Sequence, residues 1–477
     1  MVFQNRIIHY LRRLLEWHPA CRGVDGMRIH LDVTRILSRS AAPSPTGIDR
    51  VELEYAKHVL ADGGHFVVQI GDCLALAPRW LTEQVVGHLD KRWSQGGDHD
   101  QELDERVKRW RKQVRVPRPV SNIDKFFRSL EGKRFSARLK ITRSERAYMA
   151  KKAPIVPAGI SAIAVAAVPF LFKKALTSDH KSSAKVLFSP VSLSNVYLNV
   201  GHTGLEKDRL LGNLKKNPNW KTAIYVHDVL PITHPHLFVD GTKQKHDVRM
   251  RNVVKFSDIV FANSHFTAEE TERLYKRKVD AVLEIGSEAS TRVPSHLGER
   301  TGFVSIGTVE PRKNYLWLVT SWISFCKKYP DIVKGEKLNI FGASGWLNGS
   351  NLERLKEEIE SSSNVEMIHG ASDEDVVAEL KRSRAYLTAA EVEGWGMPLA
   401  ESLSLGTPVI CSDVKAHREV TRGKASFFEF NNEEELHALL LKSYTDGAEE
   451  MAETASQFEP WLWESHFARL KSLSQSF

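Results

Sequence analysis

The sequence predicts an α/β protein built of two Rossmann-like, doubly wound domains that face a cleft, with a basic and apolar insertion in the N-terminal domain. Its 477 residues are 42% hydrophobic and 26% charged, which suits two or three folded, mostly water-soluble domains. Strand-like and helix-like runs alternate in two series, and such alternation is typical of parallel sheets covered by helices. The polar stretch 286–300 separates the two series, so we expect domains at 1–285 and 286–477.

The first series gives the elements expected in the N-terminal domain. A helix should open after the turn Pro45-Thr46-Gly47 and cover residues 49–60. Alternating or continuous apolar runs predict strands at 28–33, 66–70, 185–188, 222–226 and 258–262.

The second series gives the elements expected in the C-terminal domain. The strands are expected at 302–306, 337–341, 365–368, 385–388 and 408–411, and helices at 352–361 and 374–382. Ligands of open α/β sheets bind at the carboxyl ends of the strands, which would here border the cleft between the domains. The last helix, around Trp463, is expected to pack back on the N-terminal domain.

Positive charge is concentrated in an insertion at about 91–185. The net charge is +8, yet residues 101–152 hold 17 Lys and Arg against 6 Asp and Glu, while the rest of the chain holds 50 against 53. A helix is expected at 103–114. The uncharged run Ala153–Phe172 then lies between two pairs of lysines, which favours contact of about 101–174 with an anionic membrane. Its three prolines favour shallow or re-entrant insertion over a span, and a buried core helix or a flexible insertion are the alternatives.

Other features narrow the class of protein. The Arg-containing amphipathic pattern at 5–17 suits either a second membrane contact or a helix packed on its own domain. Four widely separated cysteines argue against a disulfide framework or a zinc site, and the N-terminus has no signal-peptide pattern, so we expect a cytoplasmic protein, peripheral on the inner face of the cell membrane. No nucleic-acid-binding motif accompanies the charge, so nucleic acid is not an expected partner.

The passage Glu391 to Cys411, EVEGWGMPLAESLSLGTPVIC, is the most informative for chemistry. Its Gly-Trp-Gly turn leads into a helix with Pro398 at its expected first position, and a helix N-terminus of this kind attracts a phosphate or diphosphate. Glu401, one turn into the helix, could accept hydrogen bonds from the two hydroxyls of a ribose, while Glu393 would face the far side of the phosphate. Alternatively, the glycines only shape a turn and both glutamates are solvated.

A second passage, Gly307 to Asn314 (GTVEPRKN), follows a strand of the same domain. It places Arg312 and Lys313 in a loop at the same edge, where they could neutralise a leaving diphosphate without a metal. Two possible metal patterns, Asp98-His99-Asp100 and His234-Pro235-His236, lack further ligands, so no metal is expected.

These residues match a known family. The C-terminal half resembles the retaining glycosyltransferases of family 4, which have the GT-B architecture and transfer a sugar from a nucleotide-diphosphate donor. The resemblance covers about 170 residues and rests on five motifs in order: 307–314, 370–375, the E-x7-E motif at Glu393 and Glu401, 406–410, and Trp463-Glu464. The motifs at 46–51, 227–232 and Asn263-Ser264 extend it to the N-terminal half. There they are most similar to the bacterial polysaccharide branch, many of whose members use GDP-mannose.

The resemblance implies a role for each matching residue. Lys313 and Arg312 would bind the diphosphate, Glu401 the ribose, and His227 the sugar from the opposite domain. Glu393, with the amides of the following loop, would orient the transferred sugar. Further contacts to the donor are expected from Gly47, Gly307, Gly394, Trp395, Gly396, Met397 and Pro398. Some relatives have an arginine where this chain has Thr308, and the insertion is not covered by the resemblance.

The expected activity is retaining transfer of a hexose, with mannose favoured, to a glycan or lipid-linked acceptor in polysaccharide or lipopolysaccharide synthesis. Asp228 is the one carboxylate that could act as a nucleophile, but its expected role is to orient His227, and a front-face substitution is therefore favoured. The alternatives are an inactive GT-B-like membrane scaffold and a nucleotide-sugar epimerase or phosphorylase of the same fold.

Overall fold

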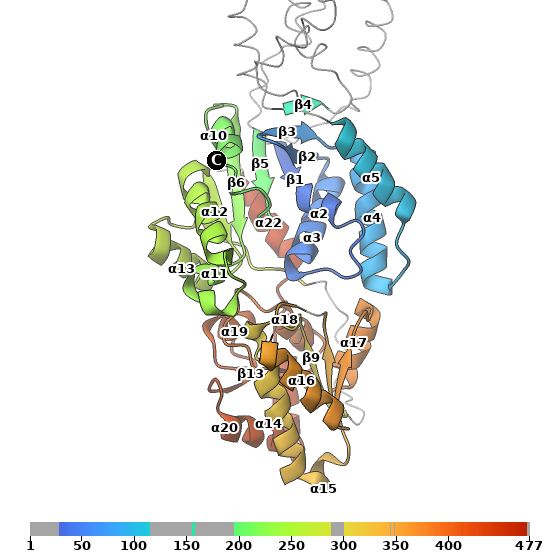
Figure 1. The fold of residues 1–477 in the computed structure, drawn as a ribbon. Helices are drawn as coiled ribbons and strands as arrows, with labels where there is room; N and C mark the ends of the chain where they lie inside the picture. Colours follow the sequence, from blue (N-terminus) through green and yellow to red (C-terminus); the bar gives the residue numbers. More distant parts are fainter. Residues whose placement is uncertain are drawn as a thin grey trace, which may run out of the picture.

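The computed structural model describes residues 28–114, 155–157, 195–287, 300–343, 345–347 and 349–474. They form two α/β domains arranged one above the other, each with a central sheet (Figure 1). The expected fold class is confirmed, because most sheet neighbours are parallel and helices connect them.

The sheet of the N-terminal domain has the strand order β4-β3-β2-β1-β5-β6-β7-β8 in the described residues. Strands β2 and β3 form an antiparallel hairpin, in which Gly71 has a φ of +60°, and the other described neighbours are parallel. The bounds are β1 Arg28–Asp32, β2 His65–Ile70, β3 Cys73–Leu76, β4 Ile155–Pro157, β5 Asn195–Asn199, β6 Trp220–Val226, β7 Ile259–Ala262 and β8 Ala281–Val282. Four predicted strands are confirmed, whereas β3, β5 and β8 were missed and 185–188 lies outside the described residues.

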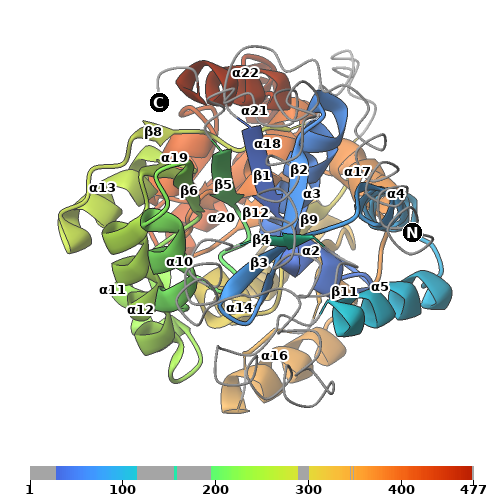
Figure 2. The same cartoon turned by 90° about the horizontal axis from the view of Figure 1, so that it is seen from above.

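The helices of this domain are α2 Thr34–Ser38, α3 Gly47–Asp62, α4 Arg79–Gln95, α5 Gln101–Gln113, α10 Asp208–Lys215, α11 Leu230–Thr233, η1 Pro235–Leu237, α12 Thr242–Phe256 and α13 His265–Tyr275. Helix α3 confirms the predicted helix but starts at Gly47, two residues earlier than expected, because Thr46 and Asp49 form a reciprocal capping box; it ends before Gly63, whose φ is +77°. Seen from above, α10 to α13 gather on one side and α3 to α5 on the other (Figure 2).

The insertion is described only in part. Helix α5 confirms the predicted helix at 103–114 and buries Leu103, Val107 and Trp110, while four of its basic residues are exposed: Lys108, Arg109, Arg111 and Lys112. The apolar run 153–172 does not begin as a membrane helix: Ile155–Pro157 is strand β4, which pairs in parallel with β3 at the sheet edge. Its other residues, and the amphipathic stretch 5–17, lie outside the described residues. Within the described ranges, no helix combines the length and the hydropathy needed to cross a bilayer.

The C-terminal domain has a parallel sheet with the order β11-β10-β9-β12-β13-β14. All five predicted strands are confirmed, and β14 was missed. The bounds are β9 Phe303–Ile306, β10 Leu338–Phe341, β11 Val365–Ile368, β12 Ala385–Thr388, β13 Val409–Ser412 and β14 Ser426–Phe428. Its helices are η2 Pro311–Lys313, α14 Tyr315–Lys328, α15 Pro330–Val333, α16 Gly349–Ser361, α17 Asp373–Arg382, α18 Met397–Ser404, α19 Lys415–Val420, α20 Glu433–Lys442 and α21 Gly447–Ser456.

The last helix, α22 (Trp463–Ser474), packs against α3 of the other domain. Phe467 stacks on His58 with ring centroids 3.9 Å apart, and the Tyr55 hydroxyl donates a hydrogen bond of 2.8 Å to His466 Nε2. A side chain at Gly286 would come within 2.4 Å of the backbone nitrogen of Trp463, so only glycine allows the two segments to lie this close.

Candidate active site

Two neighbouring strands of the C-terminal sheet position the candidate site. Strand β9 leads into the turn 307–314, and β12 leads through residues 389–396 into α18. The strand order reverses between β9 and β12, because the chain continues from β9 to β10 on one side and reaches β12 on the other. Such a switch point at the carboxyl edge is where open α/β sheets bind ligands.

Arg312, Lys313 and Glu393 form a buried ion cluster at this edge. The guanidinium of Arg312 donates to one oxygen of the Glu393 carboxylate, and the ammonium of Lys313 donates to the other. Arg312 also pairs with Glu310. The side chains of Lys313 and Glu393 are 8% and 7% exposed, so water screens this attraction weakly. The structure thus brings the three residues predicted from two separate motifs into direct contact.

The pKa values in this cluster reflect both burial and charge. Burial alone raises the pKa of Glu393, but the charges of Arg312 and Lys313 outweigh it and lower this pKa to about 2. Burial raises the pKa of Glu310, partly offset by Arg312. The charges of the two cations and the two carboxylates cancel. An entering diphosphate would therefore have to compete with Glu393 for Arg312 and Lys313.

Glycines allow the backbone to approach this cluster. Gly307 has a φ of +154°, and a side chain there would come within 3.1 Å of the Tyr315 hydroxyl and 3.2 Å of Lys313 Cε. Gly396, with a φ of +97°, immediately precedes α18. Helix α18 begins at Met397, so Pro398 is its second residue and not, as predicted, its first. No side chain in the described residues caps this N-terminus, where Pro398 has no N–H and the Leu399 N–H donates to the Gly396 oxygen over 3.1 Å, so the Met397 N–H is the group left for a ligand.

The N-terminal domain meets this loop directly. A side chain at Gly394 would lie 2.6 Å from the backbone oxygen of His227, and the Ser264 hydroxyl donates to the Gly394 oxygen over 2.8 Å. A side chain at Gly47 would lie 3.2 Å from Cε of Met397, so the N-terminal ends of α3 and α18 face each other. The ring of Trp395 is buried against Trp461, so only its backbone is available to a ligand.

His227 is held as a neutral ring of known tautomer. Its Nε2 lies 2.7 Å from the carbonyl oxygen of Val200, which can only accept, so Nε2 carries the proton and Nδ1 is an acceptor. Burial lowers the pKa of His227 to about 4. The predicted role of Asp228 is wrong: Val200 orients the ring, while the Asp228 carboxylate accepts from the Leu230 backbone N–H over 3.2 Å at the start of α11.

Glu401 lies apart from the ion cluster. It is half-buried on α18, and burial raises its pKa while the charge of Arg50 lowers it. Arg50 itself donates two hydrogen bonds to Asp373 at the start of α17. Arg50 and Asp373 were missed, although both stand within motifs that carried the resemblance.

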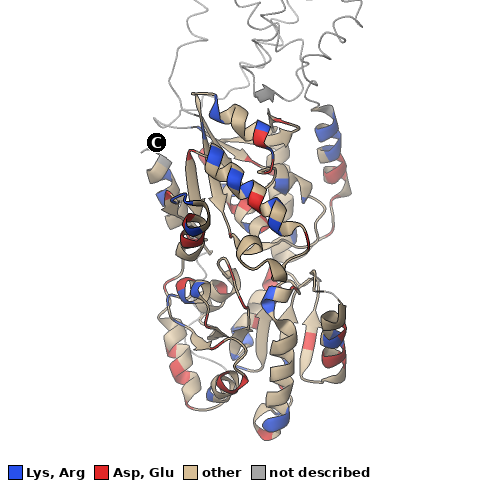
Figure 3. Ribbon diagram, turned by 60° about the vertical axis from the view of Figure 1, so that its left-hand side comes forward, with Lys and Arg blue, Asp and Glu red and all other residues tan. Residues whose placement is uncertain are grey.

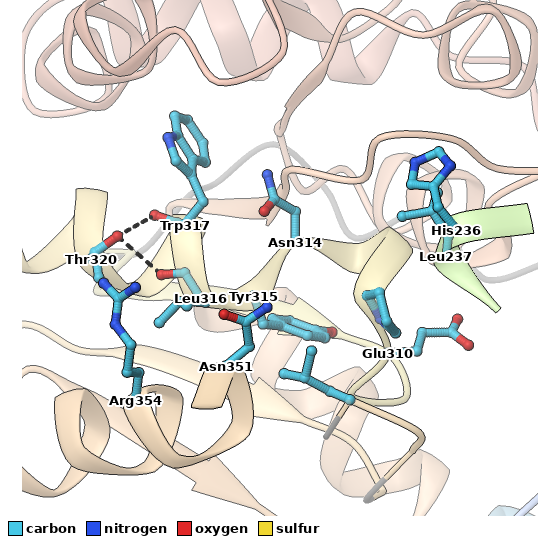
Figure 4. A pocket seen from close by; sticks show the side chains of 12 residues that line it. His236, Leu237, Glu310, Asn314, Tyr315, Leu316, Trp317, Thr320, Asn351 and Arg354 are labelled. Carbon is cyan, nitrogen blue, oxygen red and sulfur yellow. Dashed lines mark hydrogen bonds between the residues drawn. The ribbon is translucent and has the colours of Figure 1, made fainter. Parts of the chain in front are cut away.

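Two cavities adjoin the cluster. The smaller one, of about 240 Å³, is lined by both domains and reaches Glu393, with His234, Phe266 and residues 414–416 as further walls. The larger one, of about 470 Å³, adjoins Glu310 and Asn314 of the 307–314 turn but is not lined by Glu393 (Figure 4). The smaller cavity therefore offers room for a sugar at the predicted site.

Other side chains near the site had no recognised signal in the sequence. His417 is fully buried, donates from Nδ1 to the Ser412 carbonyl oxygen over 2.8 Å and lies in the electrostatic field of Glu393.

The residues of the metal-like pattern Asp98-His99-Asp100 lie away from this site. Asp100 caps α5 by accepting a hydrogen bond from the Leu103 N–H over 2.8 Å. Among the described residues, no three His, Cys, Asp or Glu side chains are placed to hold a metal ion.

The fold, two Rossmann-like α/β domains that meet beside the ion cluster, is the arrangement expected for the GT-B class. Residues 288–458 match the family model described as glycosyl transferases group 1, which confirms the resemblance in the C-terminal domain. This match does not reach the N-terminal domain.

Bacterial mannosyltransferases are among the similar curated proteins. The chain is 25% identical over 228 residues to the serotype-specific mannosyltransferase WbdA of Escherichia coli, covering 43% of this chain and 27% of WbdA. It is 24% identical over 259 residues to the O-antigen chain mannosyltransferase B of Escherichia coli, covering 50% and 66% of the two chains. The chain thus matches about a quarter of WbdA. Among solved structures, TarM aligns with a TM-score of 0.45 at 14% identity, over 59% of this chain and 54% of TarM.

Proposed function

We propose that the protein is a retaining glycosyltransferase that moves a hexose, with mannose favoured, from a nucleotide-diphosphate sugar to a glycan or lipid-linked acceptor. The observation that carries the proposal is the buried cluster of Arg312, Lys313 and Glu393 beside the uncapped N-terminus of α18. Cations beside a helix N-terminus suit a diphosphate, and a carboxylate among them suits sugar hydroxyls. The names of the relatives in the preceding section support mannose and a polysaccharide acceptor.

In this proposal the donor diphosphate displaces Glu393 from Arg312 and Lys313. Glu393, freed from these cations, then accepts hydrogen bonds from hydroxyls of the sugar within the smaller cavity that it lines. His227 accepts a further hydroxyl hydrogen bond at Nδ1, because its Nε2 is committed to Val200. Glu401 binds the ribose hydroxyls, and GDP is the favoured nucleotide.

The transfer proceeds on one face of the sugar. The bond between the anomeric carbon and the diphosphate oxygen breaks while the acceptor oxygen bonds to the same face, so the configuration is retained. The acceptor proton passes to the departing diphosphate oxygen. Arg312, Lys313 and the N-terminus of α18 stabilise the charge that develops on the diphosphate, which replaces the role that a metal plays in other transferases.

The acceptor is proposed to reach the cleft from a membrane surface. Figure 3 shows Lys and Arg along the helices of the N-terminal domain. On α5 the exposed basic residues are Lys108, Arg109, Arg111 and Lys112. Such a basic helix is attracted to anionic lipid, which supports the proposal that the enzyme acts at the inner face of the cell membrane in cell-surface polysaccharide synthesis.

The test is thermal unfolding of the full chain with GDP, UDP, ADP and their sugar conjugates, followed by transfer from radiolabelled GDP-mannose. A ligand that binds the native state at 100 times its Kd stabilises it by about 2.7 kcal/mol. We expect one nucleotide to raise Tm in the wild type and to lose this effect in Glu401→Ala. No shift with any nucleotide would favour the inactive scaffold, and conversion of the donor without transfer would favour an epimerase.

A further inference from the structure

The larger cavity, of about 470 Å³, lies between the two domains beside the candidate active site. Its walls come from η1 of the N-terminal domain and from the 307–314 turn, α14 and α16 of the C-terminal domain. Glu310 and Asn314 line it, and they flank Arg312 and Lys313 in the same short turn. The cavity therefore lies next to the turn that carries the two residues proposed to bind the diphosphate.

The cavity combines an apolar floor with polar groups at its sides (Figure 4). Leu316, Leu347 and the ring of Tyr315 form the apolar part. Asn351 and Arg354, from the first turns of α16, line one side and are both exposed. Their side chains make no hydrogen bond or ion pair with the residues that the structure describes, so an amide and a guanidinium are available to a ligand.

The remaining polar side chains of the cavity already have partners, except the indole N–H of Trp317, which makes no hydrogen bond with the described residues. The Thr320 hydroxyl donates to carbonyl oxygens of its own helix at 3.0 Å, and the Asn314 amide donates to Asn431 over 2.8 Å. His236 Nε2 lies 3.3 Å from the Glu391 carboxylate, and Glu310 pairs with Arg312. Asn351 and Arg354 are therefore the groups most able to select a ligand.

The chemistry favours a sugar over a second nucleotide. A nucleotide diphosphate needs several convergent cations or N–H groups, whereas among the described residues Arg354 is the one Lys or Arg whose side chain lines this cavity. A pyranose ring presents an apolar face and a rim of hydroxyls that both donate and accept, which fits an apolar floor flanked by an amide and a guanidinium. The volume falls within the range of small-molecule sites.

We propose that this cavity is a glycan subsite that holds a sugar residue of the acceptor, one or more residues away from the hydroxyl that receives the hexose. The inference rests on the proposed function and narrows its substrate class to an acceptor of at least two sugar residues. Contacts from Asn351 and Arg354 stabilise the longer acceptor, and η1 of the opposite domain closes over it.

The test uses manno-, gluco- and galacto-oligosaccharides of one to five residues as probes. Saturation-transfer NMR on the full chain, without donor, measures binding for the wild type, Asn351→Ala, Arg354→Ala and the control Lys356→Ala, an exposed position on the same helix that does not line the cavity. We expect at least one oligosaccharide to bind the wild type and the control, and to bind each of the two cavity variants about tenfold more weakly. Monosaccharide binding should not change.

The outcomes separate this inference from the proposed function. Donor hydrolysis without acceptor should be equal in all four proteins if the cavity serves only the acceptor. Oligosaccharide binding that is absent from the wild type, or equal in the cavity variants, would overturn the subsite whether or not the donor is turned over. Absence of donor binding and hydrolysis from the wild type would instead count against the proposed function, while length-dependent binding lost in both cavity variants would still support the subsite.

Discussion

Arg50 and Asp373 join the two domains by a bidentate ion pair, with Nη1 to Oδ2 and Nη2 to Oδ1 distances of 2.6 Å each. Arg50 belongs to the first turn of α3, and Asp373 is the first residue of α17. Burial raises the pKa of Glu401, the residue proposed to bind the ribose, and the positive charge of Arg50 partly offsets this increase. The ion pair therefore connects the contact between the domains with the nucleotide end of the proposed donor site.

The first prediction concerns this pair. Arg50→Asp and Asp373→Arg should each raise the KM for the donor several-fold, because like charges then face each other across the cleft, and the double variant should recover most of the loss. The exposed pair Lys415–Glu269 also joins the domains, at 3.6 Å, and Glu269→Ala is the control because Glu269 does not line the smaller cavity. Steady-state kinetics would measure the KM, and small-angle scattering would measure the arrangement of the two domains. An equal change in the control would show that the ion pair acts only as a general contact between the domains.

The second prediction concerns Glu393. Glu393→Gln should destabilise the free protein by about 3 kcal/mol, because Arg312 and Lys313 lose a buried counter-charge. The same change removes the competitor of the diphosphate, so the Tm increase caused by GDP should be larger than in the wild type. Transfer should fall at least about 100-fold, since a group aligned with the sugar is lost. A smaller GDP shift in the variant would contradict the proposed exchange of partners.

The third prediction compares two glycines at the domain contact. Gly394→Ala should reduce transfer strongly, because the new Cβ would lie 2.6 Å from a backbone oxygen of the other domain. Gly47→Ala should retain more activity, since its Cβ meets only the flexible end of Met397, at 3.2 Å. Gly63→Ala strains the end of α3 by about 1 kcal/mol and serves as the control for lost stability. Initial rates at saturating donor would rank the three variants.

The fourth prediction concerns pH. Burial lowers the pKa of His466 from 6.5 to about 4, with His58 and Arg469 lowering it further and the Glu284 carbonyl oxygen opposing the shift. Between these values the unfolded chain binds a proton that the folded protein does not, so this histidine makes the free energy of unfolding fall as the pH drops. The contribution reaches about 1.4 kcal/mol per pH unit.

Urea denaturation at pH 7.0, 5.5 and 4.5 would measure this dependence. His466→Gln should show a shallower decrease than the wild type, and His369→Gln, at an exposed position, should keep the wild-type slope. Parallel curves for the wild type and His466→Gln would remove His466 as a source of acid sensitivity.

The sequence was sufficient for elements with strong local signals. The strands of the C-terminal sheet were predicted because they are short apolar runs with turn residues at their ends. Arg312, Lys313 and Glu393 were found because their motifs follow two such strands. Strand β14 is only 3 residues long, so its pattern was too short to separate from a loop.

Long-range relationships could not be predicted in the same way. The sequence around Asp228 does not indicate that Val200 holds His227. Val200 follows strand β5 and His227 follows strand β6, and the pairing of these two strands brings Val200 and His227 together. The pairing of β4 with β3 is likewise a long-range contact. The apolar composition of 153–172 does not show that part of this run extends the edge of the N-terminal sheet. The cavity beside α16 is formed by both domains and has no sequence motif of its own.

The position of α22 also affects how the protein is made. The hydrogen bond between Tyr55 and His466 connects residues 411 positions apart, and Trp463, His466 and Phe467 complete the packing around Tyr55. During synthesis the N-terminal domain therefore cannot complete its packing around Tyr55 until α22 has left the ribosome. Folding of the two halves is therefore coupled, and a nascent chain halted before residue 463 should remain sensitive to protease within α3.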